Sequence, residues 1–149
     1  MINSCIPAFA KRLLRRPNAW AAMRGTEESP GPVGTLRLYQ TTAGVLVAAE
    51  FWGLPYNPSD PAIPEQFNLR IEDKSPQDAA GSVNIVHTLP PLPANHGYGF
   101  GVFLSSRFTI REVTGQRVEL FSIIKQKNPQ KGGPDTLEKP LALGIIRLN

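Results

Sequence analysis

Proline and glycine are spread along almost the whole chain and limit what it can fold into. The sequence holds 15 prolines and 13 glycines among 149 residues. Inside a helix, proline removes a hydrogen bond and clashes with the preceding turn, and glycine costs backbone entropy. A helical bundle is therefore disfavoured, and we expect one domain of short strands joined by many turns. One cysteine and two histidines also exclude an internal disulfide framework and a thiolate or histidine-rich metal cage.

Alternation of apolar and polar residues marks the expected strands. Phe67, Leu69 and Ile71 alternate with polar neighbours, which predicts that these three face a core and the residues between them face outward. Residues 41–44, Thr-Thr-Ala-Gly, are typical of a hairpin turn. The expected strands are Ala19–Gly25, Val33–Gln40, Val45–Trp52, Phe67–Asp73, Gly97–Leu104, Arg117–Ile124 and Ala142–Leu148. Seven or eight strands with long loops indicate an all-β domain, either a Greek-key sandwich or a flattened barrel.

The first 17 residues form a separate basic segment. Five Lys and Arg are the only charged residues among the first 24, whereas the rest of the chain has 11 basic and 12 acidic side chains. Apolar residues recur there at helical spacing, namely Ile6, Phe9, Ala10, Leu13 and Leu14. We therefore divide the chain into an amphipathic helical arm, residues 1–17, and a β domain, residues 18–149. Two roles stay open for the arm: packing on its own domain, or binding nucleic acid or another anionic surface.

The arm does not have the pattern of a secretory signal. Its apolar stretch precedes the basic residues, and no apolar run in the chain approaches the length of a membrane span. We expect a cytoplasmic protein, and a component of a spore or another assembled particle is compatible with this. Cys5, beside the basic residues, has some features of a reactive thiol, but a small apolar residue or an intermolecular contact is the simpler interpretation.

A series of short motifs follows the order found in one known family. They are Met-Arg-Gly at 23–25, Gly-Thr-Leu-Arg-Leu-Tyr-Gln-Thr at 34–41, Gly-Val-Leu-Val-Ala-Ala-Glu at 44–50, Gly-Leu-Pro at 53–55, Leu-Pro-Pro-Leu at 89–92, Asn-His-Gly-Tyr at 95–98, Arg-Phe-Thr-Ile-Arg-Glu-Val at 107–113 and Ala-Leu-Gly at 142–144. Over residues 9–148 the chain resembles the copper–zinc superoxide dismutases, most of all their Gram-positive bacterial branch. The resemblance implies an eight-stranded Greek-key β-barrel, similar to an immunoglobulin-like sandwich, behind the helical arm.

The same resemblance implies that the metal ligands of that family are absent here. A His-x-His pair on the fourth strand binds copper in the family, and Arg70 and Glu72 occupy those two places. Ile85 and Thr88 occupy the places of a zinc-binding His and Asp, and Phe121 that of a further copper His. A guanidinium cannot ligate a metal, so Arg70 and Glu72 more simply form a surface ion pair. We expect no copper, no zinc and no other cofactor.

Two further family features are missing at the C-terminal end. Leu143 stands where the resemblance places a cysteine of the subunit disulfide. The active-site arginine of the family falls near Pro140, with Lys139 beside it. Copper redox cycling needs three or four nitrogen ligands, and two histidines in the whole chain cannot supply them.

Two other groups of residues suggest chemistry only weakly. His87 and His96 are the candidates for an acid–base pair, but no nucleophile motif accompanies them, and ordinary loop histidines are the simpler interpretation. Glu72, Asp73 and Asp78 carry carboxylates of the kind that calcium prefers, but their spacing does not match an EF-hand loop.

Aromatic residues supply the candidate contact surfaces. By alternation we expect most of them in the core: Trp20, Phe51, Trp52, Tyr56, Tyr98, Phe100, Phe103 and Phe121. Phe51 and Trp52 are adjacent and therefore face opposite ways, so one of them leaves the interior. The candidate interface residues are Phe9, Leu13 and Leu14 of the arm together with the outward member of that pair.

The sequence thus predicts a pseudoenzyme: a non-catalytic, metal-free relative of the dismutases with a structural, self-assembly or partner-binding role, expected as a homo-oligomer. Two alternatives stay open. One is an enzyme of changed chemistry, including a residual metal-dependent dismutase. The other is a protein that binds an anionic surface through its basic arm.

Overall fold

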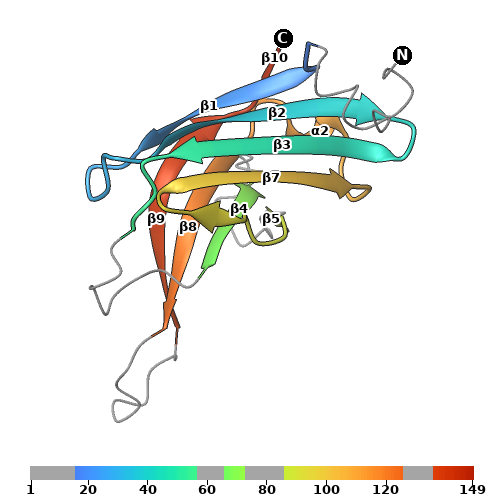
Figure 1. Cartoon of the computed structure of the whole chain (residues 1–149). Coiled ribbons are helices and arrows are strands. Elements are labelled where there is room, and N and C mark those ends of the chain that lie inside the picture. The colour runs from blue at the N-terminus through green and yellow to red at the C-terminus, as the bar shows by residue number, and fades with distance from the viewer. Residues whose placement is uncertain (1–15, 57–65, 73–85, 126–135) are drawn as a thin grey trace, which may run out of the picture.

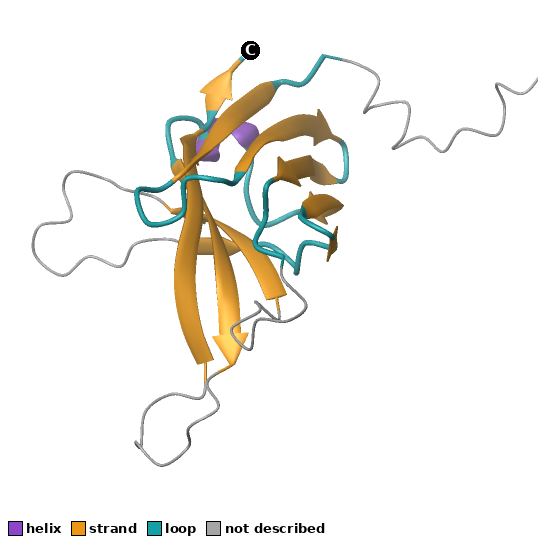
Figure 2. Ribbon diagram, turned by 60° about the vertical axis from the view of Figure 1, so that its left-hand side comes forward, coloured by secondary structure: helices purple, strands orange, loops and turns teal. Residues whose placement is uncertain are grey.

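The computed structural model describes residues 16–56, 66–72, 86–125 and 136–149. In these ranges the chain is antiparallel β-structure with one short helix (Figures 1 and 2). The all-β class expected from the sequence is therefore confirmed. The arm residues Phe9, Leu13 and Leu14 lie outside the described residues, as do Cys5 and Ile85.

The strands agree closely with the expected ones. They are β1 (Ala19–Gly25), β2 (Val33–Thr41), β3 (Gly44–Trp52), β4 (Gln66–Glu72), β5 (Val86–Thr88), β6 (Ala94–Asn95), β7 (Tyr98–Ser105), β8 (Arg117–Lys125), β9 (Thr136–Ile145) and β10 (Arg147–Leu148). The predicted last strand begins too late and runs on too far, because β9 starts at Thr136 and β10 follows as a separate strand. The sequence also missed the helix α2 (Ile110–Val113), which is capped by Thr109.

All strands join one curled sheet. Their order is β5-β4-β8-β9-β1-β2-β3-β7-β6, and β10 pairs with β1. The predicted turn at residues 41–44 is confirmed, because β2 and β3 pair from Thr41 opposite Gly44 onward. Figures 1 and 2 show the sheet curling so that β1, β2, β3 and β7 form one wall and β4, β8 and β9 another. No helix in the described ranges is long and apolar enough to cross a membrane.

The segment between β5 and β6 ties the two ends of this sheet together. The Leu89 N–H donates to the Leu69 carbonyl of β4 at 2.9 Å, and the Leu92 N–H donates to the Phe67 carbonyl at 2.8 Å. On its other side the Pro93 carbonyl accepts from an N–H of β7 at 3.0 Å. Leu89 and Leu92 are buried in the core beneath this link.

The inner face of the sheet holds the main core. Phe67, Leu69 and Ile71 are buried in it, as the alternation of β4 predicts. Asn68 lies between them on the outer side, yet it is also buried, which the sequence did not indicate. Its side-chain amide donates to the Leu89 carbonyl at 3.2 Å, because the segment after β5 runs alongside β4.

The expectation that most aromatic residues lie in the core is wrong. The exposed ones are Trp20, Trp52, Tyr56, Tyr98 and Phe100, whereas Phe51, Phe103 and Phe121 are buried. On β7, Gly99, Gly101 and Phe103 face inward, whereas Tyr98 and Phe100 face outward. A Cβ at Gly99 would lie 2.9 Å from Leu92 Cδ2, and one at Gly101 would lie 2.6 Å from Phe103 Cζ. Leu92 and Phe103 therefore leave no inner space for Tyr98 or Phe100.

Candidate functional site

The places that the resemblance assigns to metal ligands converge on one outer face of the sheet. Arg70 and Glu72 lie two residues apart on β4, Thr88 pairs opposite Arg70 on β5, and Phe121 pairs opposite Asn68 on β8. Residues two apart on a strand and residues directly opposite on its neighbours share a face. Four of the five places therefore face the same way, away from the core. The fifth lies outside the described residues.

Arg70 is the centre of a group of paired charges, which we call the charged cluster: Arg70, Glu72, Arg117, Glu119 and Glu138. Arg70 Nη2 donates to Glu119 Oε1 at 2.5 Å, and Arg70 Nη1 donates to Glu138 Oε2 at 3.0 Å. Glu72 lies between both arginines, with Oε1 3.3 Å from Arg70 Nε and Oε2 2.6 Å from Arg117 Nη2. The expected Arg70–Glu72 pair is present, but it belongs to a partly buried network rather than to an isolated surface contact.

The charged cluster is closed over an aromatic ring. The Arg70 guanidinium carbon lies 4.3 Å from the centroid of Phe121, whose side chain is buried although it faces outward. Burial acts to lower the pKa of Arg70, but the hydrogen bonds and charges of Glu119 and Glu138 outweigh it and raise the pKa above its ordinary value. Arg70 thus stays charged, with Nη1 and Nη2 each donating to a carboxylate, and is suited to neither proton transfer nor metal ligation.

The described residues at these places do not fit a copper or zinc site. Within the described ranges, no three His, Cys, Asp or Glu side chains lie close enough together to hold a metal ion. The carboxylate of Glu72, the one described member of the candidate calcium group, is bound by Arg70 and Arg117. Asp73 and Asp78 lie outside the described residues.

The two histidines pack against different aromatic rings. The His87 ring lies 5.1 Å from that of Phe108, and the His96 ring lies edge-on to Tyr56 at 4.6 Å. His96 also has a positive φ of 51°, an uncommon conformation that fits the tight turn before Gly97. The contacts of the described residues give no support to an acid–base pair of these histidines.

The C-terminal places of the family pattern also lie on or beside this face. Pro140 pairs opposite Phe121, next to the register shift that follows Leu120. Proline has no N–H to donate, so an irregular strand position suits it. Leu143, where the resemblance needs a cysteine, pairs with Glu119 of β8 and is half-buried.

The other wall carries a different kind of surface. Trp52, Tyr98 and Phe100 are 45%, 40% and 38% exposed, and we call these three residues the aromatic face. The rings of Trp52 and Tyr98 are 5.9 Å apart. The Tyr98 hydroxyl donates to Glu50 Oε2 at 2.5 Å, and this hydrogen bond raises the pKa of Tyr98. Phe51 is fully buried, so Trp52 is the outward member of the pair and Phe51 is not available for an interface.

The sequence did not single out three members of the charged cluster. Arg117 and Glu119 alternate with apolar residues on β8, which is a signal that they share a face, and Glu138 follows on the next strand. Nothing local to the sequence, however, indicates that β8 pairs with β4. The cluster depends on contacts between residues 49 and 68 positions apart.

The described residues define an antiparallel all-β domain with paired charges on one outer wall and exposed aromatic rings on the other. No family model matches the chain, and no curated protein matches it. Function must therefore be argued from the site itself.

Proposed function

We propose that this chain is a non-catalytic, metal-free relative of the copper–zinc superoxide dismutases, and that it acts by binding, first of all to further copies of itself. The observation that carries the proposal is the charged cluster. The places of a His-x-His pair hold an arginine and a glutamate whose charges are satisfied by Glu119, Glu138 and Arg117. Such a network stabilises the wall and supplies neither a ligand nor a nucleophile.

The topology supports the barrel that the resemblance implies. Apart from the two-residue strands β6 and β10, eight strands remain. β7 returns beside β3 and β8 returns beside β4, passing over the strands formed in between, as Greek-key connections do. The hydrogen bonds of the segment between β5 and β6 connect the two ends of the sheet, as closure of a barrel requires.

Elemental analysis tests the metal-free part of the proposal. We expect purified full-length protein to contain no stoichiometric copper or zinc and to show no dismutase activity above buffer, because the histidines needed for a copper site are absent. One metal ion per chain that survives dialysis contradicts the proposal. Restoration of the family pattern in Arg70→His/Glu72→His serves as a comparison, since it shows whether the assay detects binding at this face.

The aromatic face supports self-association. Trp and Tyr are enriched at the centres of interfaces, and exposed apolar groups on neighbouring strands gain most when a partner covers them. One oxygen of the Glu50 carboxylate accepts a hydrogen bond from Tyr98, so this oxygen keeps a hydrogen-bond partner in such a contact. The resemblance points the same way, because barrels of that family commonly pair.

Light scattering after size-exclusion chromatography tests the self-association. We expect the full chain to be oligomeric at micromolar concentration and Trp52→Ser/Phe100→Ser to be monomeric. Leu137→Ser/Ile145→Ser is a matched control, because both leucine and isoleucine are about half exposed on β9 of the other wall. A monomeric full chain, or equal effects of the two double variants, contradicts the proposal.

The arm is the second candidate contact in the same experiment. Asn18, the first residue after the arm, is fixed to β2: the Asn18 N–H donates to the Leu38 carbonyl, and Asn18 Oδ1 accepts from the Gln40 N–H, both at 2.9 Å. Removal of residues 1–15 leaves these bonds in place, so the shortened chain should stay folded and β-rich. A lower oligomeric state of this chain assigns part of the contact to Phe9, Leu13 and Leu14.

A further inference from the structure

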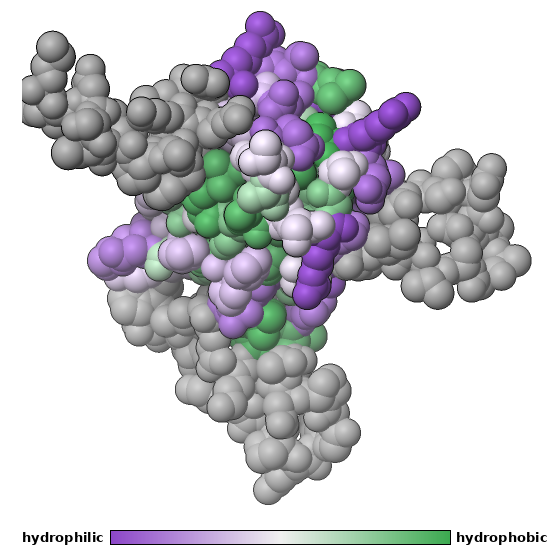
Figure 3. Space-filling model, turned by 90° about the vertical axis from the view of Figure 1, so that its right-hand side faces the viewer, coloured by the Kyte–Doolittle hydropathy of each residue, from purple (hydrophilic) through white to green (hydrophobic). Residues whose placement is uncertain are grey.

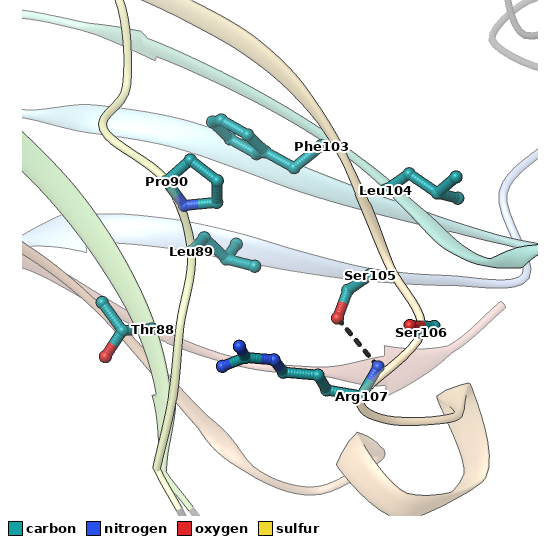
Figure 4. Close-up of a pocket in the computed structure, with 8 residues that line it drawn as sticks. All are labelled: Thr88, Leu89, Pro90, Phe103, Leu104, Ser105, Ser106 and Arg107. Atoms are coloured by element: carbon teal, nitrogen blue, oxygen red, sulfur yellow. Dashed lines mark hydrogen bonds between the residues drawn. The ribbon is translucent and has the colours of Figure 1, made fainter.

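A pocket lies between the segment that follows β5 and the C-terminal end of β7. It has a volume of about 390 Å³, within the range of pockets that hold small molecules. Figure 3 views the molecule from the side on which β7 leads into α2, and hydrophobic and hydrophilic surface lie side by side there. Figure 4 shows the side chains of Leu89 and Phe103 on the apolar side of the pocket and Arg107 reaching across it.

Arg107 gives this pocket its charge. It is the single charged residue among the lining residues, and its guanidinium extends toward Thr88 at the end of β5 and the segment that follows it (Figure 4). In the described part of the chain, no carboxylate lies within ion-pair distance of it, in contrast to Arg70 and Arg117. An arginine without a carboxylate partner, beside a concave surface, favours an anionic ligand because its forked donors match an oxyanion.

Ser105 adds a neutral donor on the same side. The Arg107 backbone N–H donates to Ser105 Oγ at 3.2 Å, drawn as the dashed line in Figure 4. A hydroxyl has one hydrogen to donate besides its acceptor positions. Because the Arg107 N–H occupies an acceptor position, the Ser105 hydroxyl hydrogen remains available for a ligand oxygen.

We propose that this pocket binds a small organic anion, with its carboxylate on Arg107 and Ser105 and its apolar body on Leu89 and Phe103. The charged and the apolar parts of the lining would bind opposite ends of one ligand. The guanidinium fixes one end, and the buried side chains exclude water from the other. This pocket is separate from the charged cluster and the aromatic face. A test of ligand binding in the pocket is therefore independent of the function proposed above.

Backbone NMR of the ¹⁵N-labelled full chain tests the site, with hexanoate as the probe. We expect hexanoate to shift the amide signals of Leu89 and of residues 105–107. Hexanol, which has the chain without the charge, and inorganic phosphate, which has charge without the chain, should each produce much smaller shifts. Arg107→Gln should weaken hexanoate binding about tenfold or more, because it removes a charge-assisted hydrogen bond.

Arg111→Gln is the matched control. Arg111 is exposed on α2, four residues further on, and its replacement removes the same charge without changing the lining of the pocket. Equal weakening by both variants means that net charge alone attracts hexanoate, and it overturns the site. The absence of shifts in residues 105–107 also overturns it, as do equal shifts from hexanol or from phosphate.

Discussion

The two walls of this sheet follow the same alternation of inward and outward residues, but they carry different kinds of side chain on their outer faces. On β4, β8 and β9 the outward residues include the charged cluster, and its Arg70 covers the ring of Phe121. On β3 and β7 they are aromatic rings that remain open to solvent. Alternation thus decides which residues leave the core, whereas cross-strand partners decide whether an outward ring becomes buried.

The aromatic wall is itself divided. Tyr39, Leu46 and Ala48 face outward near the β2–β3 hairpin, yet they are buried and form a second apolar cluster with Val102 packed against it. At the opposite end of the same strands, Trp52 and its neighbours are exposed. The open part of this wall is therefore a limited area, which is the usual form of a contact surface.

The largest difference between the two walls is expected when one outward phenylalanine on each wall is replaced by alanine and the free energy of unfolding is measured. Phe121→Ala should lower the free energy of unfolding by about 3 kcal/mol, because it removes a buried ring and the contact with Arg70. Phe100→Ala should cost about 1 kcal/mol or less, since its ring is already partly solvated. Urea denaturation measures both at low protein concentration. Similar losses would show that the walls do not differ in the way their burial indicates.

Replacement of the central cation should have the next largest effect. Arg70→Ala leaves Glu119, whose side chain is 10% exposed, without its closest partner, so we expect a loss of about 1–2 kcal/mol. Arg24→Ala, an exposed arginine on β1, should cost less than about 0.5 kcal/mol. Denaturation in low and high salt checks this, because screening should reduce the difference between the two variants. No difference between them at low salt would mean that the charged cluster contributes nothing.

The sequence predicted the strands well because alternation is a local signal. Six of the seven expected strands match within one residue at each end, from Ala19–Gly25 to β8. What failed depends on distant contacts. The inward side of β7 is set by Leu92, from the segment before the strand, whose side chain would lie 2.9 Å from a Cβ at Gly99 and 3.1 Å from one at Gly101. No pattern within β7 contains that information.

The candidate site likewise depends on contacts between strands that no local sequence pattern indicates. Arg70, Glu72, Thr88 and Phe121 were selected by resemblance, and the sheet brings them to one face. Their partner Glu119 was not selected, because the pairing of β4 with β8 joins segments on either side of β5, β6 and β7. The pocket at Arg107 was likewise not expected, since it forms where the segment after β5 passes the end of β7.

The smallest expected effect lies on the aromatic face and concerns one proton. Tyr98 donates its hydroxyl hydrogen to Glu50, which holds the pKa of Tyr98 above its ordinary value. The folded state therefore binds this proton more tightly than the unfolded state does. The stabilisation is fully present below the ordinary tyrosine pKa of about 10 and is lost as the pH rises through the raised pKa of the folded protein.

Glu50→Gln removes the charge that accepts the hydrogen bond, so it should move the Tyr98 titration to lower pH. Carbon NMR of the Tyr98 ring follows this titration directly, and Glu27→Gln, in the loop after β1, removes an equal charge away from the ring. An unchanged Tyr98 titration in Glu50→Gln would show that Glu50 does not hold this proton, and that its carboxylate enters any contact on this face without a hydrogen bond from Tyr98.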